Sequence, residues 1–282
     1  MRVYLEGVGL CGPGLDGWAE SSRILAGTQL YAPRPIRVPP IDILPANERR
    51  RTVQTARLAV AVGLEALATA ARDAAAMPVV FTSSGGDGDT IHEILKTLAS
   101  PNPEVSPTRF HNSVHNAPAG YWSIAARSRA PSSSICCYDH SFAAGLLEAA
   151  VIATTEASAV AVIAYDVQYP EPLHSARPIG TSFAAALALS AEATPTAFAS
   201  LDIELRPTAG AETISKSREL EALRSSTPAA RSLPLLEAIA RETTAEIVLS
   251  YLSDMALVLQ LCPPTEQPAL SRYRSATLEH LR

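Results

Sequence analysis

Residues 134–167 restrict the possible folds of this chain more than any other stretch. Two almost wholly apolar strands, SICCY (134–138) and AVAVIAYDV (159–167), flank a predicted helix from His140 to about Thr154. Strands that are apolar on both faces are typical of parallel sheets with helices on either side. The stretch therefore predicts a strand-helix-strand unit in a layered α/β fold.

The rest of the chain continues this alternation of strands and helices. Periodicity predicts strands at 2–10, 77–84, 181–190, 198–205, 246–252 and 255–261, the last two as a hairpin. It predicts helices at 14–27, 47–74, 90–99, 213–224 and 232–242, with Asn47 as an N-cap. No linker-like stretch separates these elements, so we expect a single domain over residues 1–282.

Composition and charge exclude several classes of protein. A chain of 282 residues with 47% hydrophobic content can bury a large core. The net charge is −5 and the only lysines are Lys96 and Lys216, so no basic face is available for nucleic acid. The N-terminus is interpreted as a strand rather than a signal peptide, and polar residues interrupt the apolar stretch 142–165. We therefore expect a cytoplasmic protein with no membrane span.

The cysteines and glycine-rich stretches do not form a recognisable cofactor or metal site. Cys136 and Cys137 are adjacent and lack the CxxC spacing of metal knuckles, so we expect free thiols. GVGLCG (7–12) matches GxGxxG after a strand, but no acidic residue follows at the distance that a ribose contact requires. SSGGDGD (83–89) lacks the Lys-Ser/Thr pair of a phosphate-binding loop. We predict no cofactor.

Two polar stretches have both a functional and an ordinary interpretation. His111 and His115 in HNSVH have the spacing of zinc ligands on a helix, but the glutamate of HExxH is missing. Hydrogen bonding at a helix start or a subunit contact is the favoured interpretation, and no metal is predicted. ERRR (48–51) is more typical of a solvated helix face than of a phosphate clamp, with contact to a carrier protein as a weaker alternative.

The segment VSPTRFHNSVHNAPAGYWSIAARSRAPSSSICCYDHSFAAGLLEAA (105–150) resembles the core of the β-ketoacyl synthases of the thiolase superfamily. RVYLEGVGLCGPGLDGW, VVFTSSGGDG and RPIGTSFAAALALS occur in the matching order, so the resemblance covers about residues 1–190. It implies a thiolase-like, layered α/β/α fold whose second half, 191–282, is truncated or rebuilt.

The resemblance also implies which residue occupies the nucleophile position. Synthases of this family carry a pattern like I-S-T-A-C-A-S-G-x-x-A-L, which places Ile135 at the strand position and Asp139 at the cysteine. Cys136 and Cys137 then fall earlier, inside the strand. A carboxylate at a helix N-terminus is a good cap but a poor acyl carrier. We therefore interpret Asp139 as an N-cap in a vacated nucleophile site, with no catalytic residue.

The partners of a synthase nucleophile are missing as well. Ketoacyl synthases need two histidines in segments like H-x-G-T-G and N-x-F-G-F-G-G, which assist decarboxylation and bind the oxyanion. After residue 150 the chain has only His174 and His280, and neither lies in such a segment. Lys216 lies in a polar helix. The chain is therefore expected to have no activity on its own.

A synthase fold without these groups resembles the chain length factors, in particular the short form found in aryl polyene and related pigment clusters. Such subunits pair with a catalytic β-ketoacyl-ACP synthase and help to shape the tunnel for the acyl chain on acyl carrier protein. The resemblance implies that role here, with the vestigial site or tunnel wall formed by Cys137, Tyr138, Asp139, His140 and Phe142.

The resemblance also predicts a dimer interface. In the thiolase fold the strand before the nucleophile pairs with its counterpart across the dimer axis, and the small residues of SSSICC would let two sheets meet closely. The expected interface residues are Phe110, His111, Asn112, His115, Asn116, Ser132, Ser133, Ser134, Ile135 and Cys136.

Two other functions remain open from the sequence. The first is a cysteine acyltransferase that uses Cys137 with His140 as its base. The second is a self-associating homodimer without a ligand, in which Tyr138 and Phe142 fill the former synthase pocket.

Overall fold

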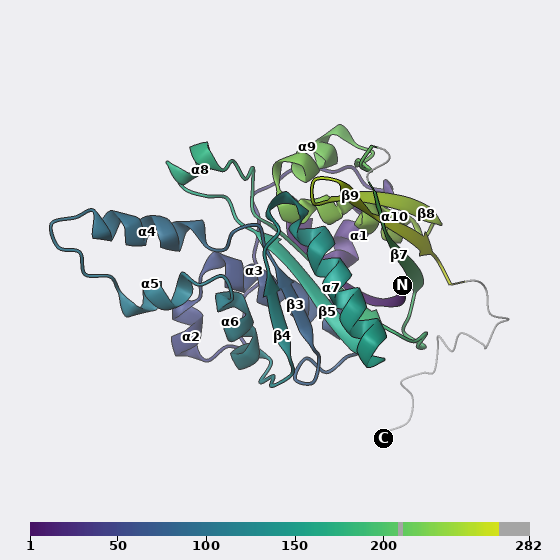
Figure 1. Cartoon of the computed structure of the whole chain (residues 1–282), viewed down its shortest axis with the longest axis horizontal. Helices are drawn as coiled ribbons and strands as arrows, with labels where there is room; N and C mark the ends of the chain where they lie inside the picture. The colour runs from purple at the N-terminus through teal and green to yellow at the C-terminus, as the bar shows by residue number, and fades with distance from the viewer. Residues whose placement is uncertain (208–210, 265–282) are drawn as a thin grey trace, which may run out of the picture.

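The computed structural model describes residues 1–207 and 211–264, which form a mixed sheet of nine strands between two layers of helices (Figure 1). The strands are β1 (Arg2–Gly12), β2 (Leu15–Asp16), β3 (Val79–Thr82), β4 (Ser132–Ile135), β5 (Ala159–Asp166), β6 (Phe183–Ser190), β7 (Ala199–Pro207), β8 (Ala245–Tyr251) and β9 (Met255–Cys262). The strand order is β4-β3-β5-β6-β1-β7-β9-β8, with β2 paired to β1.

Helices connect and cover these strands. The α-helices are α1 (Trp18–Ala26), α2 (Ala46–Arg51), α3 (Gln54–Thr69), α4 (Gly88–Leu98), α5 (Pro107–Asn112), α6 (Ala117–Ala125), α7 (Ser141–Glu156), α8 (Leu173–Ala176), α9 (Arg218–Ser226) and α10 (Leu233–Arg241). Two 3₁₀ helices, η1 (Tyr138–His140) and η2 (Pro228–Ser232), precede α7 and α10. The predicted alternation of strand and helix is therefore confirmed.

The sheet is parallel only around the predicted strand-helix-strand unit. β3 pairs in parallel with both β4 and β5, and the other neighbouring strands pair antiparallel. The strands of the last third continue the sheet, because β7 pairs with β1 and β9 pairs with β7. β4 ends the sheet order on one side and β8 ends it on the other.

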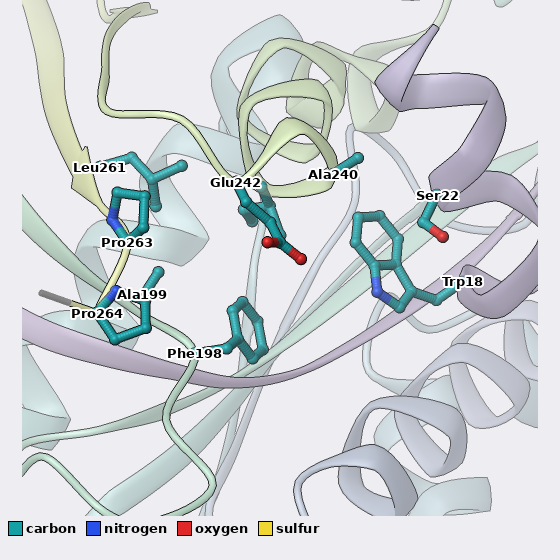
Figure 2. A pocket seen from close by; sticks show the side chains of 10 residues that line it. Trp18, Ser22, Phe198, Ala199, Ala240, Glu242, Leu261, Pro263 and Pro264 are labelled. Atoms are coloured by element: carbon teal, nitrogen blue, oxygen red, sulfur yellow. The ribbon is translucent and has the colours of Figure 1, made fainter. Parts of the chain in front are cut away.

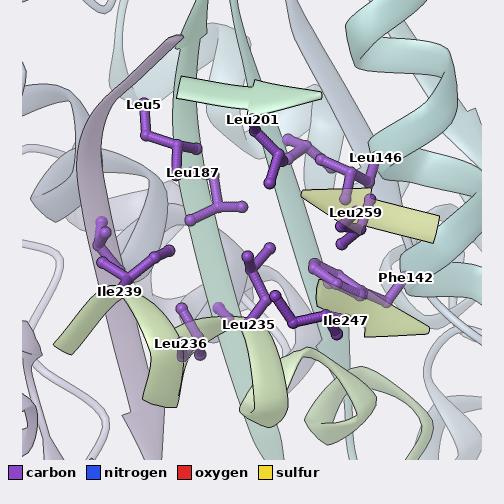
Figure 3. Close-up of a cluster of buried hydrophobic side chains, with 14 of the residues drawn as sticks. Leu5, Phe142, Leu146, Leu187, Leu201, Leu235, Leu236, Ile239, Ile247 and Leu259 are labelled. Atoms are coloured by element: carbon purple, nitrogen blue, oxygen red, sulfur yellow. The ribbon is translucent and has the colours of Figure 1, made fainter. Parts of the chain in front are cut away.

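Two hydrophobic clusters lie on opposite faces of the sheet. One contains buried side chains of α1, α7 and α10, which meet leucines of the strands (Figure 3). The other packs α3 and α6 against β3, β5 and β6, with Phe81 and Trp122 in edge-to-face contact at 6.2 Å between ring centroids. Side chains of one strand alternate between the two clusters, which explains why these strands are apolar throughout.

Two close approaches between elements require glycine. A Cβ at Gly9 of β1 would lie 1.9 Å from the Val62 carbonyl oxygen on α3. A Cβ at Gly145 of α7 would lie 2.6 Å from the Thr82 side chain on β3. The absence of a side chain at Gly145 lets α7 begin directly beside the end of β3, and this places the turn before α7 against the sheet.

The structure corrects several of the predictions about element boundaries. The helix predicted at 14–27 begins only at Trp18, after the short strand β2, and the helix predicted at 213–224 begins at Arg218. The predicted helix 47–74 is two helices, because Thr52 and Val53 adopt extended backbone between α2 and α3. Asn47 lies inside α2, and Pro45 occupies the N-cap position. β4 ends at Ile135, so Cys136 and Cys137 lie in the following turn and not in the strand.

Two parts of the described structure, the edge strand β4 and the helices α4 and α5, lie at or beyond the edge of the packed body of the chain. β4 pairs with β3 on one side, and its other edge has no strand partner among residues 1–207 and 211–264. α4 and α5 project from the body of the molecule as an arm (Figure 1).

In residues 1–207 and 211–264, no helix is both long and apolar enough to span a membrane.

Candidate functional site

The turn 136–141 connects the edge strand β4 to the long helix α7. Tyr138 has a φ of 51°, a left-handed conformation that is strained for a residue with a side chain. Ser141 closes the turn, since its Oγ accepts from the Cys137 N–H (3.0 Å) and donates to the Tyr138 carbonyl (2.7 Å). Thr82 at the end of β3 donates to the Ser141 carbonyl (2.6 Å). The turn is therefore tied to the sheet at the position expected for a nucleophile.

Asp139 is held by arginines rather than acting as a helix cap. Its Oδ1 accepts from Arg177 Nη2 at 2.5 Å, and its Oδ2 lies 3.8 Å from Arg231 Nη2. His140 occupies the N-cap position of α7, which has no side-chain cap bond. The predicted N-cap role of Asp139 is therefore wrong, and the physical reason is that two cations attract its carboxylate away from the helix N-terminus.

The ion pairs continue from Asp139 into the last third of the chain. Arg231 on η2 also binds Glu212 (3.2 Å), and Glu212 binds Arg224 on α9 (3.1 Å). Arg224 in turn forms two hydrogen bonds with Glu221, and the bond from Arg224 lowers the pKa of that carboxyl. Asp139 thus belongs to a series of alternating charges that begins at Arg177 and connects the turn to α9.

Tyr138 extends outward from the turn. Its side chain is 59% exposed, and the Arg177 guanidinium carbon lies 3.6 Å from the centroid of its ring. This distance is typical of a cation-π contact. Tyr138 therefore does not fill a pocket within this chain, contrary to the prediction made for a ligand-free homodimer.

Cys137 and His140 are not arranged as a nucleophile and its base. The His140 Nδ1 lies 3.1 Å from the Ser250 carbonyl oxygen on β8, so this nitrogen must donate. Within the described ranges, no hydrogen bond joins the Cys137 thiol to the imidazole. Burial, and secondarily the neighbouring Cys136, raises the pKa of the Cys137 thiol. A raised pKa reduces the thiolate fraction on which nucleophilic reaction depends.

A buried carboxylate lies at the end of β5, beside the same end of β3. Asp166 accepts from the Ser83 hydroxyl (3.2 Å), from the N–H (2.8 Å) and hydroxyl (2.7 Å) of Ser84, and from the Ala229 N–H (2.8 Å). Burial raises the pKa of Asp166 to about 6, although these hydrogen bonds act in the opposite direction. Asp166 therefore anchors the 83–84 loop to η2, and both segments adjoin the turn 136–141.

Phe142 is a core residue. Its ring is buried in the cluster shown in Figure 3, together with Ile247 and Leu259 of the C-terminal hairpin. A small hollow beside it is lined by Asp139, His140, Phe142, Ala143, Glu212, Arg231, Leu249 and Ser250, and it has no room for a water-sized molecule. The tunnel expected along the turn is therefore closed at this point by the chain's own side chains.

The predicted interface residues have different environments in the chain. Phe110 on α5 is 68% exposed, whereas Asn112 is buried and donates to the Arg51 carbonyl (2.9 Å). The ring of His111 meets Tyr121 edge to face, and His115 Nε2 lies 3.3 Å from the Ser83 carbonyl oxygen. The predicted residues that are exposed in the chain are Phe110, His111, Asn116, Ser132 and Cys136; Ser133, Ser134, Ile135 and His115 are half-buried.

The two histidines of HNSVH do not form one helical face, because α5 ends at Asn112 and His115 lies beyond it. In residues 1–207 and 211–264, no group of three or more metal-binding side chains is found. His174 lies on α8, and His280 is outside the described residues.

Two groups of residues that were not among the predicted site residues stand out in the structure. Ile91, Ile94, Leu95 and Leu98 follow helical i, i+3, i+4, i+7 spacing on α4, and Leu95 and Leu98 remain 51% and 54% exposed. This stripe was visible in the sequence as an amphipathic helix. Arg177 and Arg231 were not identifiable, since their pairing with Asp139 depends on the tertiary fold.

A second hollow lies apart from the turn and shares no lining residue with the first. It has a volume of about 330 Å³ and lies between α1, α10 and the ends of β7 and β9 (Figure 2). Its lining consists of Trp18, Ser22, Phe198, Ala199, Ile239, Ala240, Glu242, Leu261, Pro263 and Pro264. These ten lining residues include no cysteine or histidine, so we do not assign an acyl-transfer reaction to this hollow.

Comparison with known proteins identifies the family of this chain. The family model for the β-ketoacyl synthase N-terminal domain matches residues 18–250, whereas no curated protein matches the sequence. Among solved structures, a chain of the ketosynthase ApeO in complex with its chain length factor ApeC from Xenorhabdus doucetiae superposes with a TM-score of 0.70 at 24% identity. That match covers 92% of this chain and 99% of the other.

Two further solved structures resemble the fold of this chain to a similar degree. The ishigamide ketosynthase/chain length factor superposes with a TM-score of 0.68 at 14% identity, covering 93% of this chain and 99% of the other. The AntDE:AntF complex, a type II polyketide ketosynthase with its acyl carrier protein, superposes with a TM-score of 0.69 at 12% identity and the same coverage. At these identities the likeness concerns the fold. The chain belongs to the β-ketoacyl synthase N-terminal domain family and has a thiolase-like, layered α/β/α fold.

Proposed function

We propose that this protein is a noncatalytic chain length factor, which pairs with a catalytic β-ketoacyl-ACP synthase. The observation that carries the proposal is the environment of Asp139. A carboxylate stands at the position predicted for the nucleophile, and Arg177 holds it at 2.5 Å. An ion-paired carboxylate is a weak nucleophile, and the neighbouring Cys137 thiol has a raised pKa and no hydrogen bond to His140.

Two surfaces that the described residues leave uncovered support pairing with another ketoacyl synthase chain. The outer edge of β4 presents backbone N–H and C=O groups to which a partner strand can bind. The arm formed by α4 and α5 exposes the apolar side chains of Leu95, Leu98 and Phe110. Exposed apolar surface of this kind is typical of a protein interface. These surfaces include part of the interface that the sequence predicts.

The role of the subunit follows from this pairing. Phe110 lies exposed on α5 in the arm. We propose that its ring reaches the acyl tunnel when a partner is bound at the β4 edge. Two of the compared structures are described as a ketosynthase with a chain length factor, and a third contains an acyl carrier protein. We propose that the partner carries out the condensation on acyl carrier protein, in aryl polyene biosynthesis in the cytoplasm, while this chain limits the length of the product.

The homodimer remains the second candidate, because the same uncovered surfaces would also accept a second copy of the chain. The cysteine acyltransferase is less well supported, since His140 faces the Ser250 carbonyl and makes no hydrogen bond with the Cys137 thiol. Coexpression with a catalytic β-ketoacyl-ACP synthase separates the two remaining candidates. We expect a stable complex of the two chains, and a homodimer that excludes the synthase would contradict the proposal.

The change Phe110→Ala tests the proposed role in setting product length. If the Phe110 ring closes the tunnel of the assembled complex, its removal leaves more room for the acyl chain. We expect products longer by at least one two-carbon unit, measured by mass spectrometry after coexpression with the synthase and acyl carrier protein.

A matched control for this variant is Leu30→Ala, which changes a side chain that is 93% exposed on the segment after α1. It should leave the product lengths as they are. Copurification of the two subunits confirms that each variant still assembles. An unchanged product distribution for an assembled Phe110→Ala complex would argue against a tunnel contact.

A further inference from the structure

Two arginines from separate parts of the chain converge on the carboxylate of Asp139. Arg177 follows α8 and binds Oδ1 at 2.5 Å, while Arg231 belongs to η2 and lies 3.8 Å from Oδ2. Each oxygen of the carboxylate therefore faces a different guanidinium group. Guanidinium groups bind carboxylates through charge-assisted hydrogen bonds, and this chemistry is the same for a side chain and for a free organic acid.

The surroundings of both guanidinium groups hold them in place. Arg177 lies over the Tyr138 ring at 3.6 Å, and Arg231 is fixed on its other side by Glu212. The side chains of Arg177, Arg231 and Asp139 are only 19%, 22% and 30% exposed. Partial burial strengthens such pairs relative to fully exposed ones.

The hollow beside Asp139 leaves no space for a further ligand. The hollow that Asp139 and Arg231 line has no room for a water-sized molecule while the side chain is in place. Beyond Cα, the side chain of aspartate is an acetate group. Removal of this side chain would leave a vacancy of that size between Arg177 and Arg231.

We propose that Arg177 and Arg231 form a binding site for small carboxylates, which Asp139 occupies as a ligand tethered to the chain. The tether keeps the site filled because the ligand cannot diffuse away. The consequence for the native protein is autoinhibition of this site: free organic acids are kept out, and the turn 136–141 is fastened to η2. This inference rests on the ion pairs alone and does not require a synthase partner.

The proposal is tested by replacing the tethered ligand with a free one in the purified chain. The variant Asp139→Ala should have a melting temperature lower by about 2–4 °C, the shift expected for a loss of one modest interaction in a domain of this size. Sodium acetate should restore most of this loss with a saturable dependence, with half the effect at an acetate concentration on the order of 10 mM. Sodium chloride at equal ionic strength should not.

Two controls separate a binding site from a general effect of the salt. The wild-type chain should respond equally to acetate and chloride, since its site is occupied. The double variant Asp139→Ala/Arg177→Gln should lose the acetate response. If Asp139→Ala does not fold in chloride, its refolding yield in acetate against chloride gives the same comparison. Equal responses of Asp139→Ala to the two salts, in melting or in refolding, would overturn the proposal.

Discussion

Replacing Ser134 by proline is expected to weaken association with the synthase about 100-fold, while the chain itself keeps its fold. The reason lies in the direction of the backbone groups of β4. The carbonyls of Pro131 and Ile135 accept from the Val79 and Ser83 N–H groups, so alternate residues of β4 face β3. Ser134 lies between these positions, and its N–H and C=O face the outer edge.

Proline at position 134 removes an N–H group that faces the outer edge of β4, where a partner strand would bind. Its ring also occupies the space into which that strand must move. Loss of one or two intermolecular hydrogen bonds together with this clash is worth roughly 3 kcal/mol, which corresponds to the expected 100-fold change. Ser133 precedes the new proline and already has the extended backbone that proline requires of its neighbour.

The association is measured by titrating the labelled synthase with each variant. Ser134→Ala keeps the N–H group and should bind like the wild type. Ser133→Pro removes an N–H that faces β3, so it should also lower the melting temperature of the isolated chain. If Ser134→Pro bound the synthase with unchanged affinity, the outer edge of β4 would not be part of the interface.

The largest loss of stability is expected for Phe142→Ala. The Phe142 ring is buried at the start of α7, where it packs with Ile247 and Leu259 (Figure 3). Deleting a buried phenylalanine ring usually costs about 3–5 kcal/mol in the free energy of unfolding, because it loses both apolar burial and packing. We expect a loss in that range by urea denaturation, with an unchanged urea dependence of the free energy.

The exposed Phe110 provides the matched comparison for this prediction. Phe110→Ala should change the stability of the isolated chain by less than about 0.5 kcal/mol, as is usual at the surface. Comparing the stabilities of the two variants thus distinguishes a phenylalanine of the core from one at the surface. A loss below about 1 kcal/mol for Phe142→Ala would show that its ring lines an open tunnel rather than the core.

The layered fold could be predicted from the sequence because its strands are buried on both faces. β5 and β6 show this directly: neighbouring side chains point into opposite clusters, and both must be apolar. The closing hairpin of β8 and β9 was also predictable, since two apolar runs are separated by a short polar segment. A run of apolar residues can be recognised within a short stretch of sequence, and such runs are enough to predict most of the strands and helices.

The boundaries that were predicted wrongly depend on the local geometry of single residues. The helical periodicity of α3 concealed the break at Thr52, where the side-chain hydroxyl returns to the Glu48 carbonyl (2.7 Å) and ends α2. The two cysteines after β4 have apolar character, yet the strand stops at Ile135 and the left-handed turn at Tyr138 follows. The hydrophobicity of the residues alone does not predict such a turn.

The environment of Asp139 could not be predicted because its partners are distant in sequence. Arg177 lies 38 residues further along the chain, and Arg231 belongs to a segment that follows α9. An acidic residue before a helix is typical of a cap. Only the fold, which brings α8 and η2 to the turn, shows that two guanidinium groups compete with the helix N-terminus for this carboxylate.

The central claim is that the chemistry belongs to the partner subunit. The measurement that tests it is the intact mass of each chain, after the purified complex has been incubated with acyl-loaded acyl carrier protein. We predict that the acyl group is found on the synthase alone and that this chain keeps its unmodified mass. An acyl thioester on Cys137 of this chain, followed by condensation with a malonyl unit when the chain is tested alone, would contradict the account.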